Sequence, residues 1–514
     1  MRRTEDLSLI RVRNLKNVMY QLEDYEFLRL KKMIVAECDE LEFLVDKRAA
    51  RSHYASPLSE GPGRGPTTRV YWGQAFPCQF NWQEAAPKTR TRDLWSHGNN
   101  VLPLRQGSPS EFLVDTPGNW ILATSFWELK ILHLSMLPNL KQIWHGKRPI
   151  FLQLDNLKEI NISFCHKLTY VFPMSMAKGL KHLQSIEILE CREMEGIFYK
   201  NKVDDKTDDN AIDWNCIRNL HLHSLPNLIG FMVQKDTTDQ CGVHDDQFSN
   251  EDVATNQPFT NDENCISTAP SSISQGEIMQ TNVSNKQVSL INEDVIGHTE
   301  MHCAFSSRLM KKRLEGLEKL KIAFCDALKV IFSFNENHLG TSGVLKSLKE
   351  LELFGLRNLM HIWFQIPPNI TGFQNLQLLV LFECYNSYLF SPQVAKLLVQ
   401  LKKIQITRRE KMEEIVLQES DKEVEATMDE IVFPQLKALE LQYMPNLRIF
   451  YGGTYAIKLP LLESLKLNQC NKMESFSYGS LSTPMLERAQ INGSSYSLVA
   501  NLNATIKRLK TDKL

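Results

Sequence analysis

The chain has 514 residues, with 59 basic and 60 acidic side chains, a formal net charge of -1 and 43% apolar residues. This composition can bury a large core, and its balanced charge excludes a protein held to nucleic acid by bulk positive charge. No apolar run approaches the roughly 18 to 20 residues that a membrane-spanning helix needs, and charges interrupt the amino-terminal stretch where a signal peptide would be apolar. We therefore expect a cytoplasmic chain without a membrane span and without a nucleic-acid partner.

The pattern L-x-x-L-x-L-x-x-(C/L)-x-x-L-x-x-(I/V/L/F) recurs along most of the chain, beginning in residues 1–45 with two units. Starts at 129, 157 and 183 fall within the roughly 20 to 29 residue period of leucine-rich repeats. Each L-x-L alternation predicts a strand that is buried on one face only. We place the unit starts at Leu7, Leu30, Leu129, Leu157, Leu183, Ile217, Leu317, Leu348, Leu376, Leu401, Leu436 and Leu462, with a decayed unit at Leu486.

Stacked units of this kind predict the α/β class, as a leucine-rich-repeat solenoid shaped as a curved horseshoe. Its concave face carries a parallel β-sheet, and its convex face carries irregular loops or short helices. Residues 126–231 and 306–490 hold most of the units. Within them, 174–183 and 392–401 are the best helix candidates, the second opened by Ser391 as a cap and Pro392 in the first turn.

Three segments break the repeat. Residues 46–125 form an irregular insert rich in proline, glycine and tryptophan, to which we assign no fold. Residues 232–305 are polar and acidic, too poor in apolar side chains to bury a core, and we expect a disordered loop there. Residues 491–514 follow the last unit as a C-terminal tail.

One block of units has been duplicated. The block that begins at Leu129 recurs at Leu348, an offset of 219, so that Trp144 corresponds to Trp363. Inside the block the offset falls to 218, because the segment after Cys384 is one residue shorter than the segment after Cys165.

Cysteines occupy one position of the unit. Eleven cysteines are too sparse for a disulfide scaffold, and no pair is spaced C-x-x-C. Six of them share the position where other units carry leucine or methionine: Cys38, Cys165, Cys191, Cys325, Cys384 and Cys470. We expect buried core thiols without a metal or redox role.

Two motifs alternate between the units: LPNLKQIW at 137–144 is of one form, and CHKLTYVF at 165–172 and CREMEGIF at 191–198 are of the other. A variant at 408–416 has Arg409 in place of the cysteine. This combination resembles the carboxy-terminal leucine-rich-repeat region of plant coiled-coil, nucleotide-binding disease-resistance proteins, over roughly 1–45 and 126–490.

The resemblance implies a receptor arm in plant defense. In that family the repeats are thought to sense a pathogen effector or an effector-modified host protein, and to restrain a nucleotide-binding domain. This chain has no G-x-x-x-x-G-K-[ST] phosphate loop, and the glycine cluster at 61–68 lacks the lysine. We therefore expect no bound cofactor. If a nucleotide-binding domain takes part, we expect it to be supplied in cis or in trans.

The candidate binding site lies on the concave strand face, where the positions between the leucines need not build a core. Four of those positions are apolar on two neighbouring strands, and exposed apolar patches of this kind often mark protein interfaces. The rival interpretation is burial of the patch under a neighbouring loop or in a twisted strand. The predicted protein-binding residues are Glu350, Glu352, Phe354, Leu378, Val380 and Phe382.

Catalytic and metal sites have little support. His221 and His223 alternate on one predicted strand, but the repeat places no third ligand beside them. Neither H-E-x-x-H, nor G-x-S-x-G, nor a kinase signature set occurs. We expect no enzyme, no catalytic residues and no metal.

Three other functions remain as alternatives, the weakest of them an enzyme built into residues 46–125. A substrate-receptor repeat protein of a ubiquitin ligase would need an F-box-like helical module, yet 1–45 already contain repeat units. An extracellular receptor would show a signal peptide, cysteine-paired caps and N-x-L-x-G-x-I-P units. The leading hypothesis is a non-catalytic protein-recognition solenoid for effector sensing and autoregulation.

Overall fold

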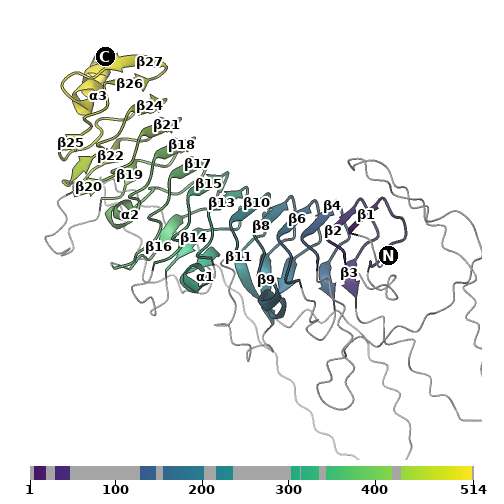
Figure 1. Cartoon of the computed structure of the whole chain (residues 1–514). Helices are drawn as coiled ribbons and strands as arrows, with labels where there is room; N and C mark the ends of the chain where they lie inside the picture. Colours follow the sequence, from purple (N-terminus) through teal and green to yellow (C-terminus); the bar gives the residue numbers. More distant parts are fainter. Residues whose placement is uncertain are drawn as a thin grey trace, which may run out of the picture. The chain divides into compact units, whose positions relative to one another are not determined.

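Each repeat contributes one strand to a single fourteen-stranded sheet, and Figure 1 shows these strands side by side in chain order. The computed structural model describes residues 5–18, 29–46, 128–145, 154–201, 216–235, 302–312, 314–334, 343–367, 369–418 and 430–511. The large sheet consists of β1 (Asp6–Ile10), β2 (Lys32–Ala36), β4 (Ile131–Ser135), β6 (Glu159–Ser163), β8 (Ser185–Leu189), β10 (Asn219–His223), β13 (Lys319–Ala323), β15 (Glu350–Phe354), β17 (Leu378–Phe382), β18 (Lys403–Thr407), β21 (Ala438–Gln442), β24 (Ser464–Asn468), β26 (Arg488–Ile491) and β27 (Ser494–Ser497).

All neighbouring strands of this sheet are parallel except the last pair, β26 and β27. The register places Leu132 opposite Ile160, Ile160 opposite Ile186, and Ile186 opposite Leu220. These side chains are buried, at most 1% exposed. The predicted parallel solenoid is therefore confirmed, because the aliphatic positions of successive units lie in adjacent rungs.

Leu7 occupies the second apolar position of the first unit, and not the first position that the sequence predicted. Leu7 lies opposite Met33, the first buried residue of β2, and not opposite Leu30. Ile10, which the pattern assigns to the core, is 39% exposed. The prediction that this unit starts at Leu7 is wrong by three residues, because two overlapping sets of apolar residues fit the motif.

A second set of strands, with most of the helical turns, forms the opposite flank, whereas the carboxyl-terminal helix α3 (Leu502–Thr511) lies beside β26 and β27 (Figure 1). The strands are β3 (Phe43–Asp46), β5 (Gln142–His145), β7 (Tyr170–Pro173), β9 (Gly196–Asn201), β11 (Gly230–Lys235), β12 (Cys303–Ser306), β14 (Val330–Ser333), β16 (His361–Phe364), β19 (Glu414–Val416), β20 (Glu430–Val432), β22 (Ile449–Tyr451), β23 (Ala456–Lys458) and β25 (Leu481–Ser482). The helices are η3 (Met174–Gly179), α1 (Ser307–Lys312), α2 (Pro392–Leu397) and α3 (Leu502–Thr511).

Both predicted helices occur but are short. In the first segment η3 is a 3-10 helix, whereas α2 has the predicted cap, with the Ser391 hydroxyl accepting from the Val394 amide at 3.4 Å. The irregular insert predicted at 46–125 lies outside the described residues apart from Asp46. Of the polar segment 232–305, only 232–235 and 302–305 are described.

The cysteine position is explained by a local hydrogen bond. In each of the six units the thiol donates to the carbonyl oxygen two residues earlier, at 3.3–3.5 Å. Five of the six thiols are buried as predicted, and only Cys470 is half-buried. Cysteine thus fills a small core position, and its thiol adds a second, weak hydrogen bond to the carbonyl of the last strand residue, which already accepts an amide from a neighbouring rung.

Aromatic side chains form a second column behind the aliphatic one. Successive ring centroids lie 4.6–6.4 Å apart from the rung of β5 to the last full repeat, a spacing typical of packed aromatic pairs. We call this column the aromatic spine. Its members are Trp144, Phe172, Phe198, Phe231, Phe305, Phe332, Trp363, Phe390, Phe433, Phe450 and Phe476.

The carboxyl-terminal segment closes the stack. The repeat pattern assigns residues 491–514 only as a tail, but they contain β27 and α3. The Asn503 side-chain oxygen accepts from the amides of Phe476 and Ser477 at 2.7 and 3.2 Å, and its Nδ2 donates to the Ser477 carbonyl at 2.9 Å. The Asn503 side chain thus makes hydrogen bonds to backbone groups of the last rung that the backbone of a further rung would otherwise make.

Candidate functional site

The six predicted protein-binding residues lie together on β15 and β17. In the register Glu350 is opposite Leu378, Glu352 opposite Val380, and Phe354 opposite Phe382. All six are half-buried, whereas the alternate residues of both strands are buried in the core. Their side chains therefore share the face of the sheet that points away from the core, which we call the open face.

Two phenylalanines form the centre of this site. The ring centroids of Phe354 and Phe382 are 6.4 Å apart, with planes inclined by 38°. The Nζ of Lys321 lies 5.3 Å from the Phe354 centroid, and the Cζ of Arg408 lies 5.3 Å from the Phe382 centroid. Each cation is attracted by the electron-rich face of its ring. These contacts stabilise the aromatic pair at a solvent-exposed surface.

Ion pairs surround the apolar patch. On the β13 side, Lys319 Nζ lies 2.9 Å from Glu350 and Lys321 Nζ lies 3.9 Å from Glu352. On the other side, Lys403 of β18 and Lys466 of β24 both approach Glu440 of β21, at 3.4 and 3.3 Å. An apolar centre with a charged rim is the usual layout of a protein-binding surface.

Sequence reasoning missed Phe324, which enlarges the site beyond the strands. Phe324 follows β13 in a left-handed conformation with φ of 52°, is 41% exposed, and donates its amide to the Phe354 carbonyl at 2.8 Å. Its ring lies against Gly355, where a Cβ would meet the ring at 2.4 Å. Glycine at 355 leaves room for this ring, and this break in the repeat was the sequence signal.

The left-handed conformation recurs directly after the strands of the large sheet. Non-glycine residues with positive φ are uncommon, so a regular row of them indicates a fixed feature of the unit. From Arg11 to Tyr443 each residue of the row donates its amide to a backbone carbonyl of the next rung, and the Gln469 amide donates to Asn492 Oδ1 instead. The row comprises Arg11, Glu37, Met136, Phe164, Glu190, Ser224, Phe324, Gly355, Glu383, Arg408, Tyr443 and Gln469.

The open-face histidines pair with carboxylates. His221 Nδ1 lies 2.9 Å from Glu187, and His223 Nδ1 lies 3.7 Å from Glu190. Each ring thus has its own acid on the preceding rung. In the described part of the chain, no three metal-ligating side chains form a cluster.

Arg409 stands at the cysteine position of its unit and is 1% exposed. Its Nη2 donates to the Asn386 side-chain oxygen and to the Asn386 carbonyl, the latter at 3.3 Å, while Nε and Nη1 find no acceptor among the described residues. Burial lowers the pKa of Arg409 to about 10. Arg409 is therefore a buried charged residue of the core below the site, and it does not belong to the open face.

Comparison with known proteins gives one family. Residues 118–192 and 270–410 match the leucine-rich repeats of RPS2-like plant disease resistance proteins, and the second segment includes all six predicted site residues. The resemblance read from the alternating motifs is confirmed over these residues. No curated protein and no solved structure matches the chain. Among the described helices, none is long and apolar enough to cross a membrane.

Proposed function

Taking as premise that residues 118–192 and 270–410 carry the repeats of RPS2-like plant disease resistance proteins, we propose that this chain is a non-catalytic recognition arm in plant defense. Its partner is a pathogen effector or an effector-modified host protein, met in the cytoplasm. The arm also restrains a nucleotide-binding domain, in cis or in trans. The family match favours this function over a substrate receptor of a ubiquitin ligase.

The aromatic pair on β15 and β17 carries the proposal. Phe354 and Phe382 are half-buried and adjacent on the open face, where neither is needed to build the core. Aromatic side chains, phenylalanine among them, and arginine are enriched in protein–protein interfaces relative to the rest of the protein surface. The partner therefore presents an apolar surface to the rings and polar groups to the surrounding lysines and glutamates.

The first block provides a matched substitution for the test. The counterparts of Phe354 and Phe382 are Ser135 and Ser163, whose hydroxyls are hydrogen-bonded at 2.9 Å. The double variant Phe354→Ser, Phe382→Ser thus installs residues that the same rung geometry already accepts. Ser135→Ala with Ser163→Ala alters an equivalent surface elsewhere and serves as the control.

The experiment uses the tagged full chain as bait in extracts of effector-challenged plant tissue, with cross-linking mass spectrometry to identify what is bound. We expect one partner, cross-linked beside β15 and β17, to be lost in the phenylalanine double variant and retained in the serine control. Defense-associated cell death should follow the same order. Equal recovery of the partner and equal cell death in both variants would contradict the proposed site.

A further inference from the structure

A groove with a volume of about 850 Å³ opens where four neighbouring strands of the large sheet end. These strands are β1, β2, β4 and β6, which lie side by side in Figure 1. All residues that line the groove belong to the described chain, and they come from the turns directly after the four strands. The groove therefore crosses four rungs along one edge of the sheet, and we call it the edge groove.

One end of the edge groove is apolar and open to solvent. Met136 and Phe164 follow β4 and β6, have φ of 51° and 54°, and are 49% and 42% exposed. The His166 ring stands edge-on against Phe164, with the two ring centroids 6.4 Å apart. Two exposed apolar side chains on adjacent rungs, outside the core, form the kind of patch that marks a protein interface.

The other end of the edge groove is charged. Arg11 after β1 and Glu37 after β2 pair with each other, with Nε and Oε2 2.5 Å apart. Arg13 on the β1 rung, and Asp39 and Glu40 on the β2 rung, are exposed and form no ion pair with another described residue. Along the groove, a cation is thus followed by two carboxylates and then by the apolar pair.

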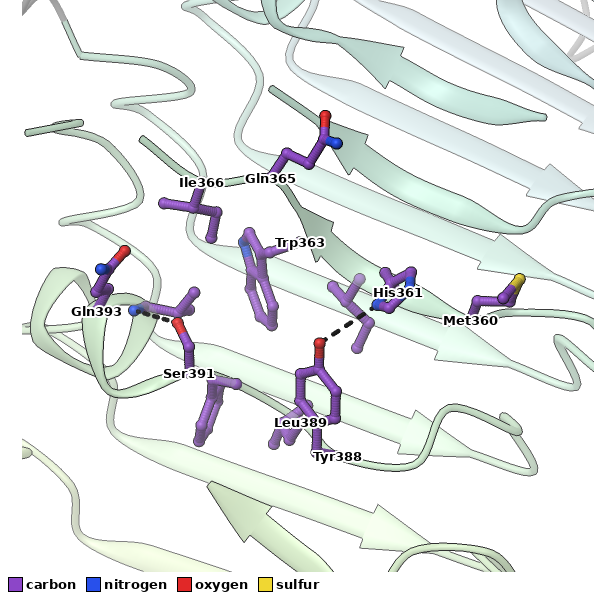
Figure 2. Close-up of a pocket in the computed structure, with 12 residues that line it drawn as sticks. Met360, His361, Trp363, Gln365, Ile366, Tyr388, Leu389, Ser391 and Gln393 are labelled. Atoms are coloured by element: carbon purple, nitrogen blue, oxygen red, sulfur yellow. Dashed lines mark hydrogen bonds between the residues drawn. The ribbon is translucent and has the colours of Figure 1, made fainter. Parts of the chain in front are cut away.

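The hollow between β16 and α2 differs from the edge groove in size and charge (Figure 2). Its volume is about 170 Å³, and Asp, Glu, Lys and Arg are absent from its lining residues, all of which lie in the described chain. The Tyr388 hydroxyl and His361 Nδ1 in this hollow lie 3.4 Å apart. It therefore has neither the length nor the charges to select an extended peptide.

The spacing of the rungs in the edge groove matches an extended peptide. Neighbouring strands lie about 4.8 Å apart, so the β1 and β6 rungs are separated by about 14 Å. An extended peptide rises about 3.3 Å per residue, and its residues i, i+2 and i+4 project to one side over about 13 Å. Three alternate side chains of such a peptide would therefore reach the cation, the carboxylates and the apolar pair in turn.

We propose that the edge groove binds an extended segment of a partner protein with the pattern acidic-x-basic-x-apolar. The acidic side chain pairs with Arg13. The basic side chain pairs with Asp39 and Glu40, and the apolar one packs on Met136 and Phe164. Complementary charges select the partner and fix its register more than they raise its affinity. The edge groove is separate from the site on β15 and β17, so this proposal does not depend on the function proposed for that site.

The second block supplies a matched variant for the apolar end. At the positions of Met136 and Phe164 it carries Gly355 and Glu383, which have φ of 59° and 52°. Met136→Gly with Phe164→Glu therefore removes the apolar pair by residues that the same turn geometry accepts.

A second variant exchanges the charges, by Arg13→Glu with Asp39→Lys and Glu40→Lys. All three side chains are exposed, so these changes leave the core intact. Phe354→Ser with Phe382→Ser, which changes only the site on β15 and β17, is the control.

The probes are two end-blocked peptides of the same composition and net charge, Gly-Asp-Ser-Lys-Ser-Phe-Gly and Gly-Lys-Ser-Asp-Ser-Phe-Gly. Their affinity for the full chain is measured by the fluorescence anisotropy of a fluorescein label. We expect the first peptide to bind roughly three- to tenfold more tightly than the second, as two exposed ion pairs allow. NMR of the chain labelled at its methionine methyl groups locates the peptide, since the signal absent from Met136→Gly identifies Met136.

Met136→Gly with Phe164→Glu should abolish binding of the first peptide while leaving the melting temperature within a few degrees. The charge-exchange variant should prefer the second peptide, and the control should bind both peptides as the parent chain does. The proposal is overturned if both peptides bind the parent chain equally, or if the folded charge-exchange variant keeps the parent's preference. It is also overturned if the Met136 signal moves only with protein concentration, which would assign the groove to a second copy of the chain.

Discussion

The two duplicated blocks have the same core and different open faces. Their buried strand positions are aliphatic in both copies, as in Leu134 and its counterpart Leu353. All six open-face positions of the first two strands differ between the copies: Ile131 with Glu350, His133 with Glu352, Ser135 with Phe354, Glu159 with Leu378, Asn161 with Val380, and Ser163 with Phe382. Burial thus constrains one face of each strand, and the other face is free to acquire a binding surface.

The blocks also differ at one place inside the core. The turn that buries Leu168 in the first block is one residue shorter in the second, where Asn386 is buried instead. On the following rung Arg409 replaces Cys191, and its guanidinium donates to Asn386. A polar pair has taken the place of a leucine and a thiol, which indicates that the deletion and the arginine compensate each other.

The largest effect is expected where the blocks are alike. Leu134→Asp and Leu353→Asp each place an unpaired carboxylate in the core, and each should cost about 3–5 kcal/mol of unfolding free energy. Urea denaturation followed by circular dichroism checks this, with Ser135→Ala as a face control. Stable, cooperative folding of either aspartate variant would contradict the shared core.

The second-largest effect is expected at the Asn386–Arg409 pair, and a double-mutant cycle tests it. Asn386→Ala removes the side-chain acceptor of a buried charge and should destabilise the chain by about 3 kcal/mol. Arg409→Cys restores the residue of the first block and should change the stability by about 1 kcal/mol, since the relief of a buried charge offsets the unpaired amide.

Together the two changes should cost about 2 kcal/mol less than the sum of the single changes. The measurement is the unfolding free energy of all four proteins. Additivity within about 0.5 kcal/mol would show that the two residues do not compensate each other.

A smaller effect is expected when the open faces are exchanged. Phe354→Ser with Phe382→Ser removes a half-buried ring contact, which should cost about 1 kcal/mol of stability. The reverse graft, Ser135→Phe with Ser163→Phe, should change stability by a similar or smaller amount. Thermal unfolding of both double variants tests this, and a loss of several kcal/mol in either would mean that the face also builds the core.

The smallest effect concerns pH, at the position where the blocks carry His133 and Glu352. Burial, followed by the charge of Lys32, lowers the pKa of His133 below its usual 6.5. The folded state then binds fewer protons than the unfolded chain, so this contribution to stability is present above pH 6.5 and is lost as the pH falls from there through the lowered pKa.

His133→Gln should therefore reduce the fall in melting temperature between about pH 7 and about pH 5. Ser135→Ala, which changes no titratable group on the same strand, is the control. An unchanged or steeper fall in the glutamine variant would contradict the assigned direction of the shift.

Much of the fold followed from the sequence because its signal is periodic. The alternation around buried strand positions such as Leu132, Ile160 and Ile186 repeats with every unit, so each rung supports the assignment of the next. The phase of the first unit was wrong because Leu7 and Ile10 fit the motif in two ways. The cap formed by β27 and α3 has no repeat to identify it, and it depends on a side chain of α3 reaching the last rung.

The candidate site was predictable in part. The strand pattern alone brought Phe354 and Phe382 to one face, since equivalent residues of parallel strands lie opposite each other. Phe324 was missed because its left-handed backbone and its contact with Gly355 involve two rungs. The edge groove was missed because the side chains that line it belong to four different rungs and do not repeat from unit to unit.

The sequence alone was enough to predict the solenoid, the buried aliphatic positions of its strands, the duplication and the family resemblance. The physical reason is that burial of one strand face requires apolar residues at regular intervals along the chain. The tertiary structure decided which side chains from different rungs lie together: the phenylalanine pair with its cations, the Asn386–Arg409 pair, and the charged and apolar residues of the edge groove. Those contacts depend on side-chain shape and direction between units, which a one-dimensional pattern does not encode.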